Sequence, residues 1–255
     1  MTDLSKSTIM KSTGLTRRSL LASTAAYLAS TATAAKARTI SGAMPWAPGA
    51  ADPPRAWRPG PWMFFTADEA ATIEAIVDRL IPSDEHGPGG KQAGCAVFID
   101  RQLAGPYGQG AGLYMKPPFL PGLPTQTAQS PEAPAAVYRA ALSAFADQVS
   151  AKFGGKHFSA LSAEDQDALL SELEKGSVDL KTIKGADFFN LLLQNTQEGY
   201  FADPIYGGNR DMAGWKLVGF PGTRYDYRDW VERHNEPYPL PPVAITGRAE
   251  WTVRD

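Results

Sequence analysis

Apolar residues recur at helical spacing in several stretches of this 255-residue chain. The first stretch, "FFTADEAATIEAIVDRLIP", places four of them on one face: Ile73, Ile76, Val77 and Leu80. Thr66 precedes this face and Glu69 follows three residues later, which is the spacing of a capping box. Pro82 cannot continue a helix. The pattern therefore predicts a helix that begins after Thr66 and ends before Pro82.

Two further helices follow from the same spacing. One is predicted over residues 96–103, with three residues facing inward: Val97, Phe98 and Leu103. The other begins at Pro134, since proline fits the first turn of a helix, and ends at Gly154. Its apolar stripe has five members: Tyr138, Leu142, Phe145, Val149 and Phe153.

Two more helices are predicted nearer the C-terminus. Ser162 caps the first, and Gly176 ends it. Glu164 and Asp165 lie in its first turn, where the helix dipole favours acids, so this carboxylate pair needs no catalytic explanation. The second, "DFFNLLLQNTQEGYF", is apolar on nearly all sides from Phe188 to Leu193, which predicts burial on several faces.

The segments between these helices show neither the helical spacing of apolar residues nor the alternation of a strand. "SDEHGPGGKQAG" and "GPYGQGAGLYMKPPFLPGLPTQTAQSPEAP" are rich in glycine and proline and are predicted to be loops. No alternating strand pattern and no strand–helix–strand rhythm occurs along the chain. We therefore expect a mainly α-helical, irregular domain with long ordered loops rich in glycine, proline and aromatic residues.

The N-terminal region has the layout of a secretory signal. In "GLTRRSLLASTAAYLASTATAAKA", Arg17 and Arg18 precede a weakly apolar run and two Ala-x-Ala cleavage sites. The run is too short to span a bilayer stably. We interpret residues 1–37 as a twin-arginine signal peptide for export to the periplasm; the alternatives are an ordinary secretory signal or a surface amphipathic helix.

Residues 38–63 form a proline- and glycine-rich arm that carries Trp46, Trp57 and Trp62. Proline disfavours both helix and central strand here, so we expect an extended segment. Three indoles indicate that it packs against an apolar surface, either of this chain or of a partner. Residues 64–255 then make up the helical domain, which ends in an irregular tail.

Charge excludes two classes of partner. Residues 1–37 carry a net charge of +4, so the remaining chain carries −6 of the total of −2. Nucleic-acid binding requires a basic face, and anionic lipid attracts polybasic segments. Neither is expected of this acidic chain.

Cofactor and catalytic motifs are missing from the sequence. It contains no Gly-x-Gly-x-x-Gly after a strand, no P-loop, no Cys-x-x-Cys-His and no Gly-x-Ser-x-Gly. His86, His157 and His234 lie on three separate predicted loops. Cys95 is the single cysteine, expected either to pack in the core or to form a disulfide with another chain. We expect no cofactor, no metal and no catalytic residue in this chain.

The segment from Asn195 to Gly222, "NTQEGYFADPIYGGNRDMAGWKLVGFPG", combines aromatic residues with six glycines. Glycine and asparagine allow left-handed backbone, so we expect a fixed, folded loop. Its polar groups either satisfy the loop's own backbone or contact another protein, since aromatic residues and arginine are enriched at interfaces. The candidate contact residues are Glu198, Tyr200, Phe201, Asp203, Tyr206, Asn209, Arg210 and Trp215.

These stretches carry a family resemblance. "FIDRQLAGPYG" and "NTQEGYFADPIYGGNRDMAGWKLVGFPG", with "FFTADEAATIEAIVDRLIP" before them and the twin-arginine leader, resemble the gluconate 2-dehydrogenase subunit 3 family. Its members are the small (gamma) subunits of membrane-bound, periplasm-facing dehydrogenases of sugars, sugar acids and polyols. The resemblance runs from about Phe64 to about Pro221.

The resemblance implies a complex of three parts. A large subunit holds FAD and catalyses the reaction, a multihaem cytochrome c subunit carries haem c and passes electrons to quinone, and the small subunit escorts and stabilises the large one. FAD is loaded in the cytoplasm, so the flavoprotein crosses the membrane folded. A twin-arginine signal on a tightly bound companion explains how it does so.

Two other functions fit the same residues. The chain is an enzyme in its own right if Glu198, Asp203 and Arg210 form a polar site. It is a free-standing periplasmic carbohydrate-binding module if Trp46, Trp57 and Trp62 stack on sugars. The substrate of the complex cannot be read from this chain, because the selecting pocket lies on another polypeptide.

Overall fold

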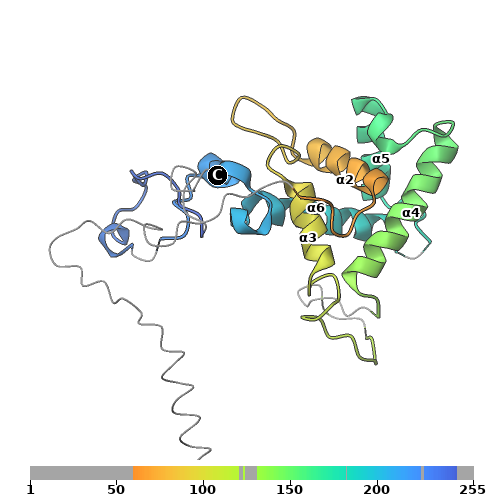
Figure 1. The fold of residues 1–255 in the computed structure, drawn as a ribbon, viewed down its shortest axis with the longest axis horizontal. Helices are drawn as coiled ribbons and strands as arrows, with labels where there is room; N and C mark the ends of the chain where they lie inside the picture. Colours follow the sequence, from red (N-terminus) through yellow and green to blue (C-terminus); the bar gives the residue numbers. More distant parts are fainter. Residues whose placement is uncertain (1–59, 121–122, 124–130, 182, 225–226, 246–255) are drawn as a thin grey trace, which may run out of the picture. The chain divides into compact units, whose positions relative to one another are not determined.

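Helices dominate the part of the chain that the structure describes (Figure 1). The computed structural model describes residues 60–120, 123, 131–181, 183–224 and 227–245, all within the unit Ala47–Asp255. Its α-helices are α2 (Ala67–Leu80), α3 (Cys95–Ala104), α4 (Pro134–Lys152), α5 (Ala163–Glu174), α6 (Gly185–Phe201) and α7 (Ala213–Val218). Over these residues the only β pairing is three isolated bridges. The prediction of a mainly α-helical fold is confirmed.

Short 3-10 turns join several of the helices. They are η1 (Phe158–Ala160), η2 (Pro204–Tyr206), η3 (Arg210–Met212) and η4 (Arg228–Trp230). Two of them, η2 and η3, lie between α6 and α7, and η4 lies in the tail after α7. The described parts of the predicted loops 83–94 and 105–133 contain no α-helix, whereas α7 lies within the predicted loop 195–222.

Helix α2 begins and ends as its sequence predicts. The Thr66 hydroxyl accepts a hydrogen bond from the Glu69 N–H, and the Glu69 carboxylate accepts one from the Thr66 N–H at 2.8 Å. Three of its four predicted core residues are fully buried, namely Ile73, Ile76 and Val77, and Leu80 is half-buried. Its last turn is tied to α5, because Arg79 donates to both carboxylate oxygens of Asp167.

Helix α6 packs against α2, α3, α5 and α7, and Figure 1 shows it running past α2 and α3. The predicted burial on several faces holds in part. Phe188, Phe189 and Leu192 are buried and Leu191 and Leu193 are half-buried, but the polar Asn190 is exposed. Gly199 permits the close approach to α3, since a β-carbon there would lie 3.1 Å from the β-carbon of Phe98.

Helix α4 also follows its prediction. Four members of the stripe are buried, Tyr138, Leu142, Phe145 and Val149, while Phe153 is half-buried at the C-cap. Gly154 follows with a positive φ of 60°. On α3, Phe98 and Leu103 are buried as expected, but Val97 is only half-buried, because it faces Gly207 in the segment after α6 and not the helical core.

The end of the predicted arm is fixed to α3 by a buried carboxylate. Asp100 is 1% exposed and accepts hydrogen bonds from the backbone N–H groups of Met63, Phe64 and Phe65 at 2.8–2.9 Å. Trp62, half-buried, packs against the core with its ring edge-on to Phe65. This end of the arm therefore lies on the chain's own apolar surface.

The N-terminal predictions lie outside the described residues. These are the signal peptide 1–37 with Arg17 and Arg18, and the arm up to residue 59 with Trp46 and Trp57. The boundaries at 37 and 63 stay predictions. Among the helices that the structure describes, none combines the length and the apolar character that a membrane crossing requires.

Candidate partner-docking surface

The segment predicted as a loop from Asn195 to Gly222 is more regular than expected. Helix α6 ends at Phe201, as the predicted helix "DFFNLLLQNTQEGYF" does, but α7 (Ala213–Val218) is a further helix within the predicted loop. This segment folds back on the end of α6. The indole N–H of Trp215 donates to the carbonyl of Phe201 at 2.7 Å. A β-carbon at Gly208 would lie 2.1 Å from the carbonyl oxygen of Gly199, so only glycine fits this close backbone approach.

Asn209 organises this fold from the inside. It is fully buried and adopts left-handed backbone, with φ 44° and ψ 43°. Its side-chain amide donates to the carbonyl of Ala202 and accepts from the N–H of Gly214, both at 2.8 Å. Asparagine is one of the few residues that tolerate this conformation and bond to both sides. Its role is therefore to join the end of α6 to the start of α7.

Asp203 joins the same region to the tail. It is 8% exposed, and its two carboxylate oxygens accept hydrogen bonds from the N–H groups of Ile205, at 3.0 Å, and Ile245, at 2.8 Å. A parallel bridge between Gly222 and Val243 fixes the tail nearby. Both oxygens of Asp203 have structural partners, which argues against a catalytic carboxylate at this position.

Two predicted contact residues are aromatic side chains of the interior. The hydroxyl of Tyr200 donates to the carbonyl of Pro88 at 2.8 Å, and the residue is only 3% exposed. Trp215 is 5% exposed, and its ring lies edge-on to Phe220. With Asn209 and Asp203, four of the eight predicted residues therefore satisfy the chain's own structure.

The other four predicted residues reach the surface. Phe201 and Tyr206 are exposed, and Arg210 is half-buried. Glu198 is exposed on α6, where its carboxylate accepts hydrogen bonds from Gln194 and Asn195 at 2.9 and 3.0 Å. Asn195 in turn accepts from the hydroxyl of the fully buried Tyr138, at 2.7 Å. Glu198 is thus the outer end of a polar network that begins in the core.

The sequence prediction of contact residues did not include Leu217 and Val218 of α7 or Phe220, two residues after the helix. Leu217, Val218 and Phe220 are 45–60% exposed, although a short amphipathic helix normally buries such side chains. Phe201, also exposed, lies beside the start of α7, since a β-carbon at Gly214 would lie 3.1 Å from its ring. We call Phe201, Leu217, Val218 and Phe220 the α7 surface.

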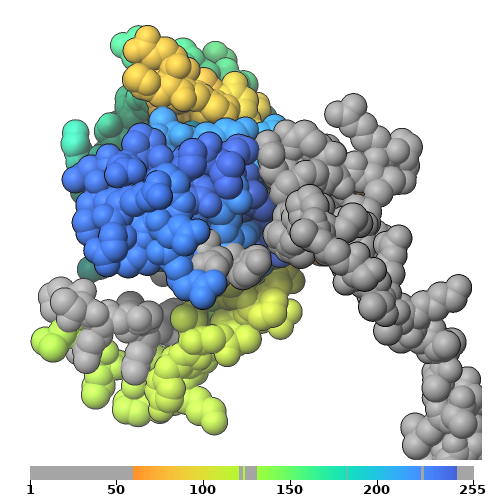
Figure 2. Space-filling view, turned by 90° about the vertical axis from the view of Figure 1, so that its left-hand side faces the viewer, coloured from red at the N-terminus to blue at the C-terminus, as the bar shows by residue number. Residues whose placement is uncertain are grey.

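Figure 2 looks onto this C-terminal part of the described chain, coloured in blue shades. Two hollows flank α7. One, of about 360 Å³, is lined by His86, Pro88, Gln92, Arg210, Asp211, Ala213, Lys216 and Leu217. The other, of about 380 Å³, lies between Trp215, Lys216, Gly219, Phe220 and Pro221 on one side and residues 238–242 on the other. Lys216 borders both hollows.

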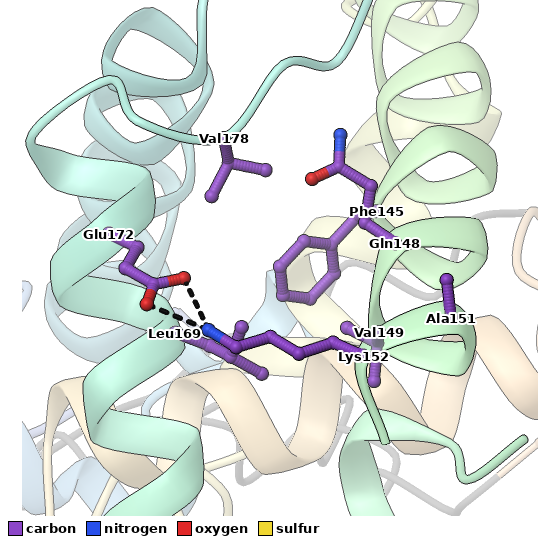
Figure 3. A pocket seen from close by; sticks show the side chains of 8 residues that line it. All are labelled: Phe145, Gln148, Val149, Ala151, Lys152, Leu169, Glu172 and Val178. Atoms are coloured by element: carbon purple, nitrogen blue, oxygen red, sulfur yellow. Dashed lines mark hydrogen bonds and ion pairs between the residues drawn. The ribbon is translucent and has the colours of Figure 1, made fainter. Parts of the chain in front are cut away.

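A third hollow, of about 380 Å³, lies between α4 and α5 (Figure 3). Phe145, Val149, Leu169 and Val178 give it an apolar lining, and an ion pair between Lys152 and Glu172 crosses it at 2.7 Å. This arrangement joins two helices.

No cluster of metal ligands forms among the described residues. Over these residues, no three His, Cys, Asp or Glu side chains lie close enough to hold a metal ion. His86, His157 and His234 lie exposed on three separate loops. Cys95 is completely buried, and burial raises the pKa of its thiol to about 12, which agrees with core packing.

Comparison with known families identifies the class of this protein. The model of the gluconate 2-dehydrogenase subunit 3 family matches residues 67–222, which run from α2 through α7 to the bridge at Gly222. The match covers more than half of the chain, so the chain belongs to this family and is a subunit of a dehydrogenase complex. Comparison with curated proteins and with solved structures gave no significant match.

Proposed function

We propose that this chain is a non-catalytic accessory subunit of a periplasm-facing flavoprotein dehydrogenase complex of the gluconate 2-dehydrogenase type. In this role it escorts the FAD-containing large subunit through twin-arginine export and stabilises it, and a multihaem cytochrome c subunit completes the complex. The family match over residues 67–222 carries the proposal, since it makes the chain one subunit of several.

The structure supports an accessory role in two ways. Asp203, one of the carboxylates of the candidate polar site, is buried with both oxygens bonded to backbone N–H groups. Glu198 accepts hydrogen bonds from its own helix. At the same time, large apolar side chains are exposed around α7, as at a protein contact. The chain thus has a surface for a partner, and the carboxylates of Asp203 and Glu198 accept hydrogen bonds from the chain itself.

Export is tested through the leader. The chain with Arg17→Lys and Arg18→Lys is co-expressed with the flavoprotein subunit, and both proteins are followed in cytoplasmic and periplasmic fractions. We expect both to stay in the cytoplasm, because the signal on this chain carries the pair. The matched control replaces Lys6 and Lys11, outside the arginine pair, with arginine, and leaves export unchanged.

The export strain tests the escort role, and the purified chain tests the two rival functions. Normal periplasmic dehydrogenase activity in the Arg17→Lys, Arg18→Lys strain would contradict the escort role. Oxidation of gluconate, fructose or sorbitol by the purified chain, with an artificial electron acceptor and without added flavin, would establish an enzyme. Quenching of its tryptophan fluorescence by sugar would establish a carbohydrate-binding module.

A further inference from the structure

The apolar side chains of the α7 surface are about half exposed to solvent. Leu217 and Val218 are 47% and 60% exposed, and Phe220, just after the helix, is 45% exposed. Their outward position is fixed from below, because Trp215 is buried and bonded to Phe201 and Gly214 is bonded to Asn209. A rigid support with exposed apolar residues has the anatomy of a preformed interface core.

The hollow beside α7 adds charge to this surface. Arg210, Lys216 and His86 line it, against a single acid, Asp211. Burial lowers the pKa of the Arg210 guanidinium, and the charge of Arg101 adds to this effect, while Glu74, Asp211 and Cys95 act in the opposite direction without cancelling it. A negative charge that enters the hollow therefore stabilises the charged form of Arg210 and complements Lys216.

The position of the surface in the chain indicates which partner it serves. All residues of the α7 surface and of its basic hollow fall within residues 67–222, the part shared with the subunit family. The second hollow is different, since one wall consists of residues 238–242, beyond the matched part. A surface built wholly from the family domain fits a partner that the family has in common, which is another subunit of the dehydrogenase.

We propose that the α7 surface docks the flavoprotein subunit, which covers Phe201, Leu217 and Val218 with apolar side chains and places a carboxylate in the hollow between Arg210 and Lys216. This inference rests on the proposed function and assigns it a location. Of the residues predicted from the sequence, it keeps Phe201 and Arg210 in the contact. It excludes Tyr200, Asp203, Asn209 and Trp215, which the chain uses internally, and adds Lys216, Leu217 and Val218, which the sequence pattern did not indicate.

The test measures binding of the full chain to the flavoprotein subunit by biolayer interferometry. Leu217→Asp places a charge in the apolar centre, and Lys216→Glu reverses the charge at the hollow. Both side chains are exposed, so both variants are expected to fold, and this is checked by circular dichroism and thermal unfolding. The matched controls are Leu120→Asp and Lys156→Glu, at exposed positions on other segments.

We expect Leu217→Asp and Lys216→Glu each to raise the Kd about tenfold or more, as at the centre of an interface, and both controls to leave it unchanged. Lys216→Arg keeps the charge and retains the affinity. The wild-type Kd rises with salt, and this dependence weakens in Lys216→Glu because a charge pair is lost.

The outcomes separate the two proposals. If the wild-type chain does not bind the flavoprotein, the proposed function fails. If it binds and both α7 variants bind equally well, only the docking site is wrong. If light scattering shows a wild-type dimer that Leu217→Asp converts to a monomer, the surface belongs to a second copy of this chain, and the inference is overturned.

Discussion

The carboxylate of Asp100 accepts a hydrogen bond from the backbone N–H of Phe65, 35 residues earlier in the chain, at 2.9 Å. The N–H groups of Met63 and Phe64 point to the same carboxylate. Three consecutive backbone donors around one carboxylate make an anion-binding turn that an acidic side chain of α3 fills. One buried acid therefore binds three consecutive N–H groups at the start of the helical domain.

Replacement of Asp100 tests how much its carboxylate contributes to the free energy of unfolding. Asp100→Asn keeps one carbonyl oxygen but turns an amide NH2 toward N–H donors. Because hydrogen bonds to charged groups contribute more than neutral ones, we expect a loss of about 2–4 kcal/mol in the free energy of unfolding. Urea unfolding of the chain measures it. Asp147→Asn, at an exposed position of α4, serves as the control, and equal midpoints for the two variants would contradict this role.

The fold could be predicted where the signals are local. The capping box of Thr66 and Glu69 and the proline that opens α4 depend on residues within one turn, and each was found where the sequence places it. The apolar stripes of α2 and α4 likewise depend on spacing alone. Such features need no knowledge of the tertiary structure.

Other features depend on contacts between distant residues. Nothing local marks Asp100, since its donors lie at residues 63–65. Helix α7 has only six residues and contains a glycine, so its sequence shows no helical period, and the bonds of Asn209 and Trp215 to the end of α6 hold it in place. For the same reason the candidate interface was predicted only in part. The glycines and aromatic residues that define its sequence mostly build the support, and the neighbouring apolar residues are exposed.

A second prediction concerns acid stability. Burial alone would raise the pKa of Glu69, but hydrogen bonds from Arg139 and Thr66 outweigh it and hold the pKa below its ordinary value. A carboxylate with a lowered folded-state pKa stabilises the protein above its unfolded-state pKa, here near 4.5, and this contribution disappears as pH falls through the folded-state value. The difference in stability between wild type and Glu69→Gln should therefore be constant above about pH 5 and shrink below about pH 4.5.

Urea unfolding at several pH values from 3 to 7 measures this difference. Glu174→Gln, at an exposed position at the end of α5, is the control and should differ little from wild type throughout. A Glu69→Gln difference that grows as the solution becomes more acidic would show that the sign is wrong.

A third prediction concerns Cys95. Because burial raises the pKa of its thiol to about 12, almost no thiolate exists at pH 8, and the side chain is inaccessible to reagents. The folded chain should react with a disulfide reagent such as dithiobis-nitrobenzoate only as fast as it unfolds, and stoichiometrically in urea. The variant Cys95→Ser has no thiol and gives the background signal of the reagent. Rapid reaction of the folded chain would instead favour the disulfide with another chain.

The last prediction separates structure from interface at Asn209. Asn209→Gly keeps the left-handed backbone but removes the bonds to Ala202 and Gly214, which leaves a part-buried carbonyl and a buried N–H without this partner. We expect the isolated chain to lose about 2–3 kcal/mol of unfolding free energy. Asn235 offers a matched control, since it also has a positive φ, 60°, but is exposed, so Asn235→Gly should change stability little. Thermal and urea unfolding without any partner measure both variants. If Asn209→Gly is less stable in the isolated chain, Asn209 is part of the support beneath α7. If its stability is unchanged but it no longer binds the flavoprotein, Asn209 contacts the partner directly.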